Sequence, residues 1–278
     1  MKIIGADFTS SPSRKKPITF AYGELDEKVL KIFSVEEVTD FIKFEAVLGD
    51  AGPYVAGLDF PFGQSQTLIN NLGWPNVWQD YVGIVSKMDR NQFCQLLDDY
   101  KKHRATGDKE HRRKIDELAS SISPQKLYGV PVGKMFYEGA KRLLATDADI
   151  VPVRRLDSTK VIVEAYPAII ARRIVGKNSY KNDQKKKQTK ELYLARKNIV
   201  DGIFSDSMVD TYKVSVAMSD EMKDKLVDDA TGDTLDAVLC AIQAGWAYQY
   251  RDRGYGIPEN ANPAEGWIAD PLFLSAEL

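Results

Sequence analysis

Cysteine and histidine are scarce in this 278-residue chain, which contains two of each. Cys94 and Cys240 lie far apart, and His103 and His111 fall in a highly charged stretch, so the four residues do not have the spacing of a zinc site. A disulfide framework is not expected from two cysteines with this separation. The sequence also contains no convincing Ser-His-Asp set or catalytic cysteine, which counts mildly in favour of a metal-based mechanism.

Long apolar runs and a strong net charge are missing as well. No run approaches the roughly 18 residues that a membrane span needs. The amino terminus passes directly from Met-Lys into a short predicted strand, without a signal peptide, so we expect a cytoplasmic protein with no membrane partner. The formal net charge of −2 gives no global attraction to nucleic acid, and a polyanionic partner must therefore contact a local basic patch.

The composition nevertheless supports a real core, because 44% of the residues are hydrophobic. We expect one elaborate α/β domain over residues 1–278. The first part of the chain predicts strands at 2–7, 18–22, 29–33 and 54–59, with a hairpin between the second and third.

A helix is predicted between the third and fourth strands. Ser34 can cap this helix, with Glu37 three residues later as its capping-box partner. The expected buried face consists of Val38, Phe41, Ile42 and Leu48. Three strands, a helix and a fourth strand form the opening order of the ribonuclease H fold, a mixed sheet flanked by helices.

The middle of the chain changes to helical periodicity. Helices are predicted at 77–88, 90–104, 112–121 and 135–144. We interpret about 64–150 as a helical insertion rather than a separate catalytic unit. A strand at 160–165, a helix started by Pro167, a basic stretch and a late apolar helix then complete the α/β core.

Five carboxylates stand where this fold would need an acidic site. Asp7, Asp59 and Glu164 each end an apolar strand, and Asp233 and Asp236 open the late helix. A charge at the end of a buried strand is costly unless it is paired or bound to a metal. A spacing of three residues places the two helical carboxylates on one face, with Cβ atoms about 5–6 Å apart. The joint pattern predicts a shared, metal-binding catalytic cleft.

Each carboxylate also has a simpler structural explanation. Asp7 and Asp59 could each start an Asx turn. Asp233 as an N-cap, with Asp236 as the third residue of a capping box, would explain the spacing on the late helix. Glu164 is harder to explain in this way, because no charge lies near it in the sequence.

Five short segments, taken in order, resemble the motifs of a known family. They are Gly5-Ala-Asp7, Gly57-Leu-Asp59-Phe-Pro-Phe-Gly63, Glu164-Ala-Tyr-Pro167, Gly232-Asp-Thr-Leu-Asp236-Ala237 and Glu265-Gly-Trp-Ile268. Together they are similar to the predicted nuclease family catalogued as domain of unknown function 429. The resemblance spans residues 1 to about 270 and implies a ribonuclease H-like fold. It also implies an acidic site of Asp7, Asp59, Glu164 and Asp236, with Asp233 beside them.

Two departures from the family pattern concern the substrate. The loop after Asp7 lacks the glycine-rich form that is common in the family, and the helical insertion matches none of its motifs. The substrate therefore has to be inferred from chemistry. Hard cations such as Mg²⁺ or Mn²⁺ prefer oxygen ligands, and two of them about 3.5–4 Å apart can activate water and stabilise a leaving oxygen. We therefore expect a metal-dependent nuclease or related phosphodiesterase, with metal ligands Asp7, Asp59, Glu164 and Asp236.

A local basic patch follows the third of these strands. Residues 172–197 contain ten lysines and arginines but only two acidic residues. We expect nucleic-acid contacts from Lys177, Lys181, Lys185, Lys186, Lys187 and Lys190. Tyr180 is available to stack on a base. The alternative is a solvated loop and helix face.

Two other functions use the same fold. Asp7-Phe-Thr-Ser-Ser could be a phosphate loop of the actin and sugar-kinase type, which would make the protein an ATP-using phosphotransferase. That architecture usually needs two such halves, and 278 residues is short for both. A non-catalytic nucleic-acid-binding protein is the third possibility, and the sequence contains no positive sign of it.

Overall fold

A mixed sheet forms the centre of the protein in a computed structural model that describes residues 1–182 and 184–275. Over these residues the sheet has seven strands in the order β5-β6-β4-β1-β2-β3-β7. They are β1 (Lys2–Asp7), β2 (Ile18–Asp26), β3 (Val29–Val38), β4 (Tyr54–Asp59), β5 (Asp149–Val151), β6 (Lys160–Glu164) and β7 (Ser215–Ala217). β2 runs antiparallel to β1 and β3, while β4, β6 and β5 run parallel to β1. The predicted α/β class is confirmed, and the strand order is consistent with a ribonuclease H-like sheet.

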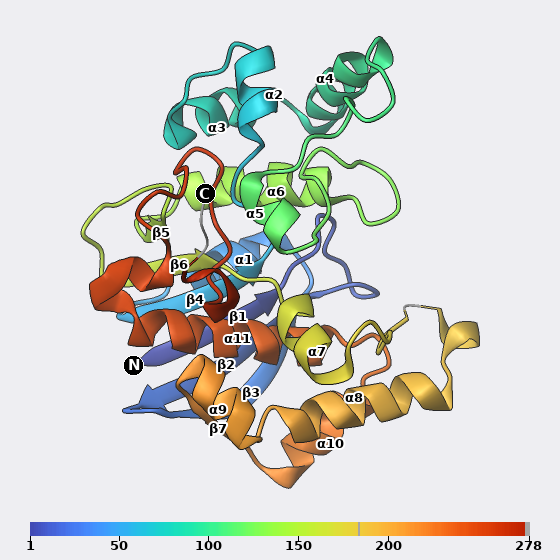
Figure 1. Ribbon diagram of the computed structural model, residues 1–278, viewed down its shortest axis with the longest axis vertical. Helices are drawn as coiled ribbons and strands as arrows, with labels where there is room; N and C mark the ends of the chain where they lie inside the picture. Colours follow the sequence, from blue (N-terminus) through green and yellow to red (C-terminus); the bar gives the residue numbers. More distant parts are fainter. Residues whose placement is uncertain (183, 276–278) are drawn as a thin grey trace.

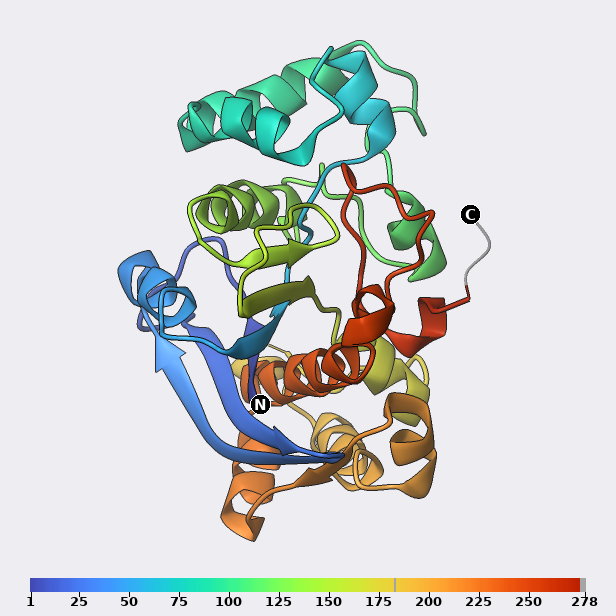
Figure 2. The ribbon, with the colours of Figure 1, turned by 90° about the vertical axis from the view of Figure 1, so that its left-hand side faces the viewer.

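Helices cover both faces of the sheet (Figures 1 and 2). One face packs against α7 (Ala168–Val175), α8 (Lys190–Gly202), α9 (Asp206–Tyr212), α10 (Asp220–Asp228) and α11 (Asp233–Gln249). The other face packs against α1 (Phe41–Leu48) and α6 (Val132–Leu144). The same hydrophobic core continues beyond α6 into α2 (Gln66–Asn71), α3 (Trp78–Ser86) and α4 (Arg90–Lys102) (Figure 2). The remaining helical segments are α5 (Lys114–Leu118), η1 (Lys185–Lys187), η2 (Arg251–Gly256) and η3 (Pro271–Phe273).

Alternation along the strands divides the core into two layers. In β1, Ile3 packs into the core with α11, whereas Ile4 and Ala6 pack into the core with α1 and α6. Most core strands are buried on both sides, as expected for strands covered by helices on both faces.

Two glycines allow α11 to lie very close to the sheet. A Cβ on Gly5 would stand 2.0 Å from the carbonyl oxygen of Ala237. A Cβ on Gly57 in β4 would stand 2.5 Å from the carbonyl oxygen of Cys240. Because no side chain separates the helix from β1 and β4, the first turn of α11 reaches the carboxyl ends of both strands.

The third strand is longer than predicted, and the predicted capping box of Ser34 and Glu37 is wrong. Residues 34–38 continue β3 and pair with β2 beyond a register shift at Phe33. Val35 packs into one core layer and Val38 into the other. Val38 ends the strand, and Phe41 and Ile42 begin the next helix three and four positions later, so the helical spacing of these apolar residues crosses the boundary between two elements.

The helix that follows starts later, at Phe41. Its N-cap is Asp40, whose carboxylate accepts a hydrogen bond from the backbone N–H of Lys43 at 2.9 Å. Leu48 is buried as predicted, but Ile42 is 79% exposed, contrary to the prediction.

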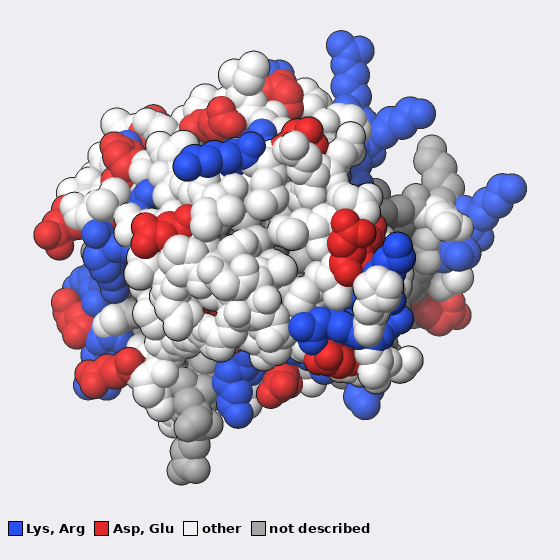
Figure 3. Space-filling model, turned by 90° about the horizontal axis from the view of Figure 1, so that it is seen from above, with Lys and Arg blue, Asp and Glu red and all other residues white. Residues whose placement is uncertain are grey.

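The predicted helical insertion is present between β4 and β5, where α2 to α6 occur. In Figures 1 and 2, α2, α3 and α4 form one end of the molecule, and α6 lies between them and the sheet. Seen from this end, the surface is largely uncharged at its centre and carries charged side chains around its margin (Figure 3). Among the described residues, this face therefore has no broad basic surface for a polyanion. No helix among the described residues is long and apolar enough to cross a membrane.

Candidate active site

Four of the predicted site carboxylates come together at one edge of the sheet. Asp7 and Asp59 are register partners at the ends of the parallel strands β1 and β4. Asp7 follows Gly5 by two residues, and Asp59 follows Gly57 by two. Because alternate residues of a strand lie on the same face, both carboxylates point towards α11, as the glycines do. Asp233 and Asp236 lie in the first turn of that helix. The charge of Asp236 acts on both strand-end carboxylates, and that of Asp233 acts on Asp7.

Lys181 places its ammonium group inside this cluster. Its Nζ contacts Oδ2 of Asp236, and the hydroxyl of Tyr180 donates to Oδ1 of the same carboxylate at 2.5 Å. Burial alone would lower the pKa of Lys181, but the charges of Asp236 and Asp7 outweigh it and raise this pKa well above its ordinary value. Lys181 therefore remains charged, and it belongs to the acidic site as well as to the basic stretch.

The buried carboxylates of Asp7 and Asp59 have far fewer polar partners than that of Asp236. Neither carboxylate accepts a hydrogen bond from any described residue. Burial, reinforced by the neighbouring carboxylates, raises the pKa of Asp59 to about 8 and that of Asp7 well above its ordinary value. Thr19 pairs with Asp7 in the register of β2, and its buried hydroxyl also has no hydrogen-bond partner within the described part of the chain. The charge of Lys181 lowers the pKa of both carboxyl groups, but it does not offset their burial, and their oxygens lack hydrogen-bond donors among the described residues.

This donor set fits a hard divalent cation. Asp7, Asp59 and Asp236 would hold it, since carboxylate oxygens are the ligands that Mg²⁺ and Mn²⁺ prefer. Among the described residues, no three His, Cys, Asp or Glu side chains are arranged as a metal site. Coordination by all three carboxylates would require them to move closer together and the Lys181 ammonium to withdraw from Asp236.

The capping explanation of Asp233 and Asp236 is wrong. The N-cap of α11 is Gly232, which has a φ of 75° and no side chain with which to cap. The carboxylate of Asp229 caps the helix instead, accepting the backbone N–H of Thr234 at 2.9 Å. The carboxylate of Asp236 is thus free of any role in the helix terminus and points at Lys181.

Glu164 faces the other way. It is the register partner of Leu58, whose side chain packs into the core layer opposite α11. Its carboxylate accepts two hydrogen bonds from Arg113, at 2.6 and 2.8 Å, and one from the backbone N–H of Phe62 at 2.9 Å. Glu164 therefore lies at the same edge as Asp7 and Asp59, but it is occupied by an arginine of the insertion.

Arg113 is buried and uses all five of its N–H groups. Besides Glu164, it donates to both carboxylate oxygens of Asp116, at 2.8 and 2.9 Å, and to the carbonyl of Glu265 at 3.1 Å. Burial would lower the pKa of Arg113, but the two carboxylates raise it well above its ordinary value. This network ties α5 to the end of β6. The sequence did not indicate Arg113 or Asp116 as site residues, because both lie in a charged stretch without strand periodicity.

A pocket of about 300 Å³ opens beside these groups, between the sheet edge and the insertion. Asp59, Glu164 and Asp236 all line it, and so do Tyr180 and Lys181. The pocket therefore gives a ligand access to the acidic site from the side of the insertion.

The basic stretch of residues 172–197 includes Tyr180 and Lys181, which contact the acidic site. Lys177, Lys186, Lys187 and Lys190 are exposed, and the side chain of Lys185 lies outside the described part of the structure. Because Tyr180 and Lys181 contact Asp236, the exposed lysines on either side of them flank the acidic site in sequence.

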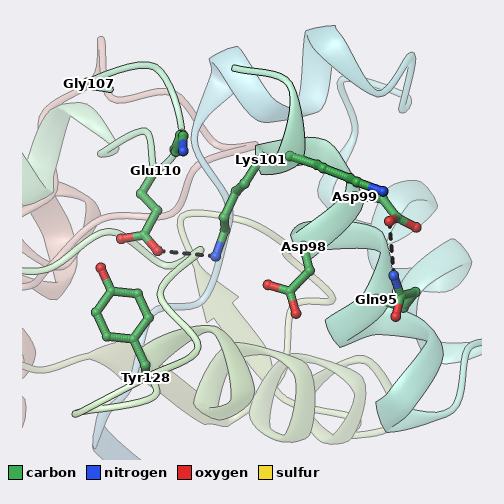
Figure 4. A pocket seen from close by; sticks show the side chains of 9 residues that line it. Gln95, Asp98, Asp99, Lys101, Gly107, Glu110 and Tyr128 are labelled. Atoms are coloured by element: carbon green, nitrogen blue, oxygen red, sulfur yellow. Dashed lines mark hydrogen bonds and ion pairs between the residues drawn. The ribbon is translucent and has the colours of Figure 1, made fainter. Parts of the chain in front are cut away.

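A larger depression of about 690 Å³ lies within the insertion (Figure 4). Its charged groups include Asp98, Asp99 and Glu110, and Lys101 bridges Glu110 at 3.1 Å and the carbonyl of Gln125 at 3.0 Å. None of the five predicted site carboxylates lines it. The smaller pocket is therefore the candidate active site.

The fold and the site define an α/β protein with a buried acidic site at the carboxyl ends of β1 and β4. The chain belongs to the family described as "Protein of unknown function (DUF429)", whose sequence model matches residues 27–262. The match includes Asp59, Glu164, Asp233 and Asp236, as well as the insertion, and it begins after Asp7. No curated protein and no solved structure matches the chain.

Proposed function

We propose that the protein is a metal-dependent nuclease or a related phosphodiesterase. The observation that carries the proposal is the convergence of Asp7, Asp59 and Asp236 at one sheet edge, with two of these carboxylates unsatisfied by hydrogen bonds. When bound, Mg²⁺ or Mn²⁺ would supply Lewis-acid stabilisation of the charge that develops on a phosphodiester.

Each side chain of the site has its own role in this proposal. Asp7, Asp59 and Asp236 would hold the cation, and Asp233 adds negative charge beside them. Lys181 lines the same pocket, and its ammonium, once released from Asp236, would be placed to meet a phosphate oxygen. Glu164, which the sequence assigned to the metal, holds Arg113 and thereby fixes the wall of the pocket.

The partner in this proposal is nucleic acid. Exposed lysines on either side of Tyr180 and Lys181 provide phosphate contacts next to the acidic site, although the chain as a whole has a net charge of −2. The expected cytoplasmic location is part of the same proposal, and cell fractionation tests it.

The test is cleavage of single- and double-stranded DNA and RNA with Mg²⁺, with Mn²⁺ and with EDTA. We expect metal-dependent cleavage that Asp59→Asn abolishes. Asp80→Asn, which changes an exposed carboxylate at the start of α3, is the matched control and should leave activity unchanged. A wild-type protein that binds Mn²⁺ but cleaves none of these substrates would overturn the proposal and direct the search to ATP binding and phosphoryl transfer.

A further inference from the structure

The candidate pocket has an apolar half that the acidic site does not use. It is formed by three parts of the chain: the start of the insertion's last helix, the turn after β6 and the carboxyl-terminal segment. The side chains concerned are Val130, Val132, Met135, Tyr166, Pro167 and Ile268. An uncharged wall directly beside Asp59 and Asp236 suits a ligand with a flat apolar part and an anionic part.

Tyr166 is the aromatic member of this wall, and it is held in place from several sides. Its backbone N–H donates to the side chain of Gln243 at 2.8 Å, and its hydroxyl accepts a hydrogen bond from Arg172 at 2.9 Å. The Arg172 guanidinium lies 5.3 Å from the ring centroid and also donates to the carbonyl of Ala119 at 2.9 Å. A fixed ring therefore stands between the acidic site and an exposed arginine.

The size of the pocket limits what can enter. A volume of about 300 Å³ lies at the lower end of the range for small-ligand sites, which accommodates one nucleotide and not a base pair. A base inside a duplex can reach such a pocket only by leaving the stack, which costs a few kcal/mol. An unpaired base does not carry this cost.

We infer that the pocket holds one unpaired nucleotide of a single-stranded nucleic acid. The base lies against Tyr166 and the apolar wall, and the phosphate faces Asp59, Asp236 and Lys181. The phosphates on either side meet Arg172 and the exposed lysines of the basic stretch. The inference rests on the proposed function and narrows its substrate to single strands.

The first experiment measures binding by fluorescence anisotropy in Ca²⁺, which carboxylate oxygens bind as they bind Mg²⁺, and denaturing gels check that the probes stay intact. The probes are a labelled 20-nucleotide DNA and RNA, each as a single strand and as a duplex of the same sequence. We expect the single strands to bind at least about tenfold more tightly, because base–aromatic stacking is open only to unpaired bases. Equal affinity for the duplexes would overturn the inference. A nucleoside monophosphate that binds as tightly as the 20-nucleotide strand would also overturn it, in favour of a mononucleotide substrate.

Variants locate the binding in the pocket. Val132→Trp fills the apolar half, and we expect it to weaken single-strand binding by about tenfold or more. Val77→Trp is the matched control, since Val77 is 50% exposed and does not line the pocket. Tyr166→Ala should cause a similar loss and Tyr166→Phe a smaller one, because phenylalanine keeps the ring. Folded Val132→Trp and Tyr166→Ala proteins with undiminished single-strand affinity would exclude this pocket.

A parallel titration with Mn²⁺ separates this inference from the proposed function. Mn²⁺ binding together with equal cleavage of single and double strands would reject only the unpaired nucleotide. The absence of nucleic-acid binding and cleavage would reject both.

Discussion

Asp59 shows how strongly the fold acts on a single carboxylate. Burial and the charge of Asp236 raise its pKa to about 8. A carboxyl whose pKa is higher in the folded than in the unfolded state binds more protons when folded. Stability that depends on such a group is therefore greatest at low pH, and it is lost as pH rises from the unfolded pKa of about 4 to the folded pKa of about 8.

This linkage gives a first prediction for the protein in EDTA. Between pH 5 and pH 8 its free energy of unfolding should fall, and Asp59→Asn should reduce that fall by roughly 1–3 kcal/mol. Urea denaturation at the two pH values measures the effect, with Asp80→Asn as the control at an exposed site. Wild-type and Asp59→Asn proteins with parallel pH profiles would show that Asp59 is already ionised without a cation.

We expect a substitution at Glu164 to affect stability rather than metal binding, because its carboxylate is already paired with Arg113. Glu164→Gln removes one of the two negative charges that hold the buried guanidinium of Arg113, and breaking such a pair costs about 3–5 kcal/mol. We expect reduced stability in thermal melts but retained Mn²⁺ binding in a titration. Asp59→Asn should show the reverse pattern. Loss of Mn²⁺ binding in a Glu164→Gln protein of normal stability would restore Glu164 as a metal ligand.

At the scale of elements, the close contact of α11 with β1 and β4 positions the site. Gly5→Ala would place a methyl group against the backbone of the helix and force the two apart. We expect a loss of about 3 kcal/mol or more, together with weaker Mn²⁺ binding, since Asp236 moves away from Asp7. In Gly83→Ala the new methyl group meets no described atom within 4 Å, so this control in α3 should raise stability by about 0.5–1 kcal/mol. A stable Gly5→Ala protein with unchanged Mn²⁺ affinity would contradict this role of α11.

The segment between α7 and α8 carries the prediction for nucleic-acid binding. Replacing Lys186 and Lys187 by glutamine should weaken binding and reduce the slope of log affinity against log salt, by up to about 0.7 per lost contact on single strands. The control replaces the exposed Lys28 and Lys31, which lie in the β2–β3 hairpin. A salt slope that is the same in both double variants would identify the segment as an ordinary solvated surface.

At the scale of the whole molecule, the sequence specified the strands and their terminal carboxylates well. Strands such as β1 and β4 are apolar runs that end in a charge, and this pattern is local. The direction of Glu164 could not be read in the same way, because it depends on the pairing of β6 with β4. Arg113 was not predicted as a site residue, and Lys181 was predicted only to contact nucleic acid. Each meets a carboxylate partner that lies more than 50 positions away in the sequence. The three-residue strands β5 and β7 are too short to produce a pattern.

The central claim is that Asp7, Asp59 and Asp236 form one cation site. The most direct measurement is anomalous diffraction from crystals of the protein soaked in Mn²⁺. We predict a peak bounded by these three carboxylates, with the Lys181 ammonium displaced from Asp236 and Glu164 still on Arg113. A saturating soak that leaves this position without a peak, with Lys181 still in contact with Asp236, would contradict the account.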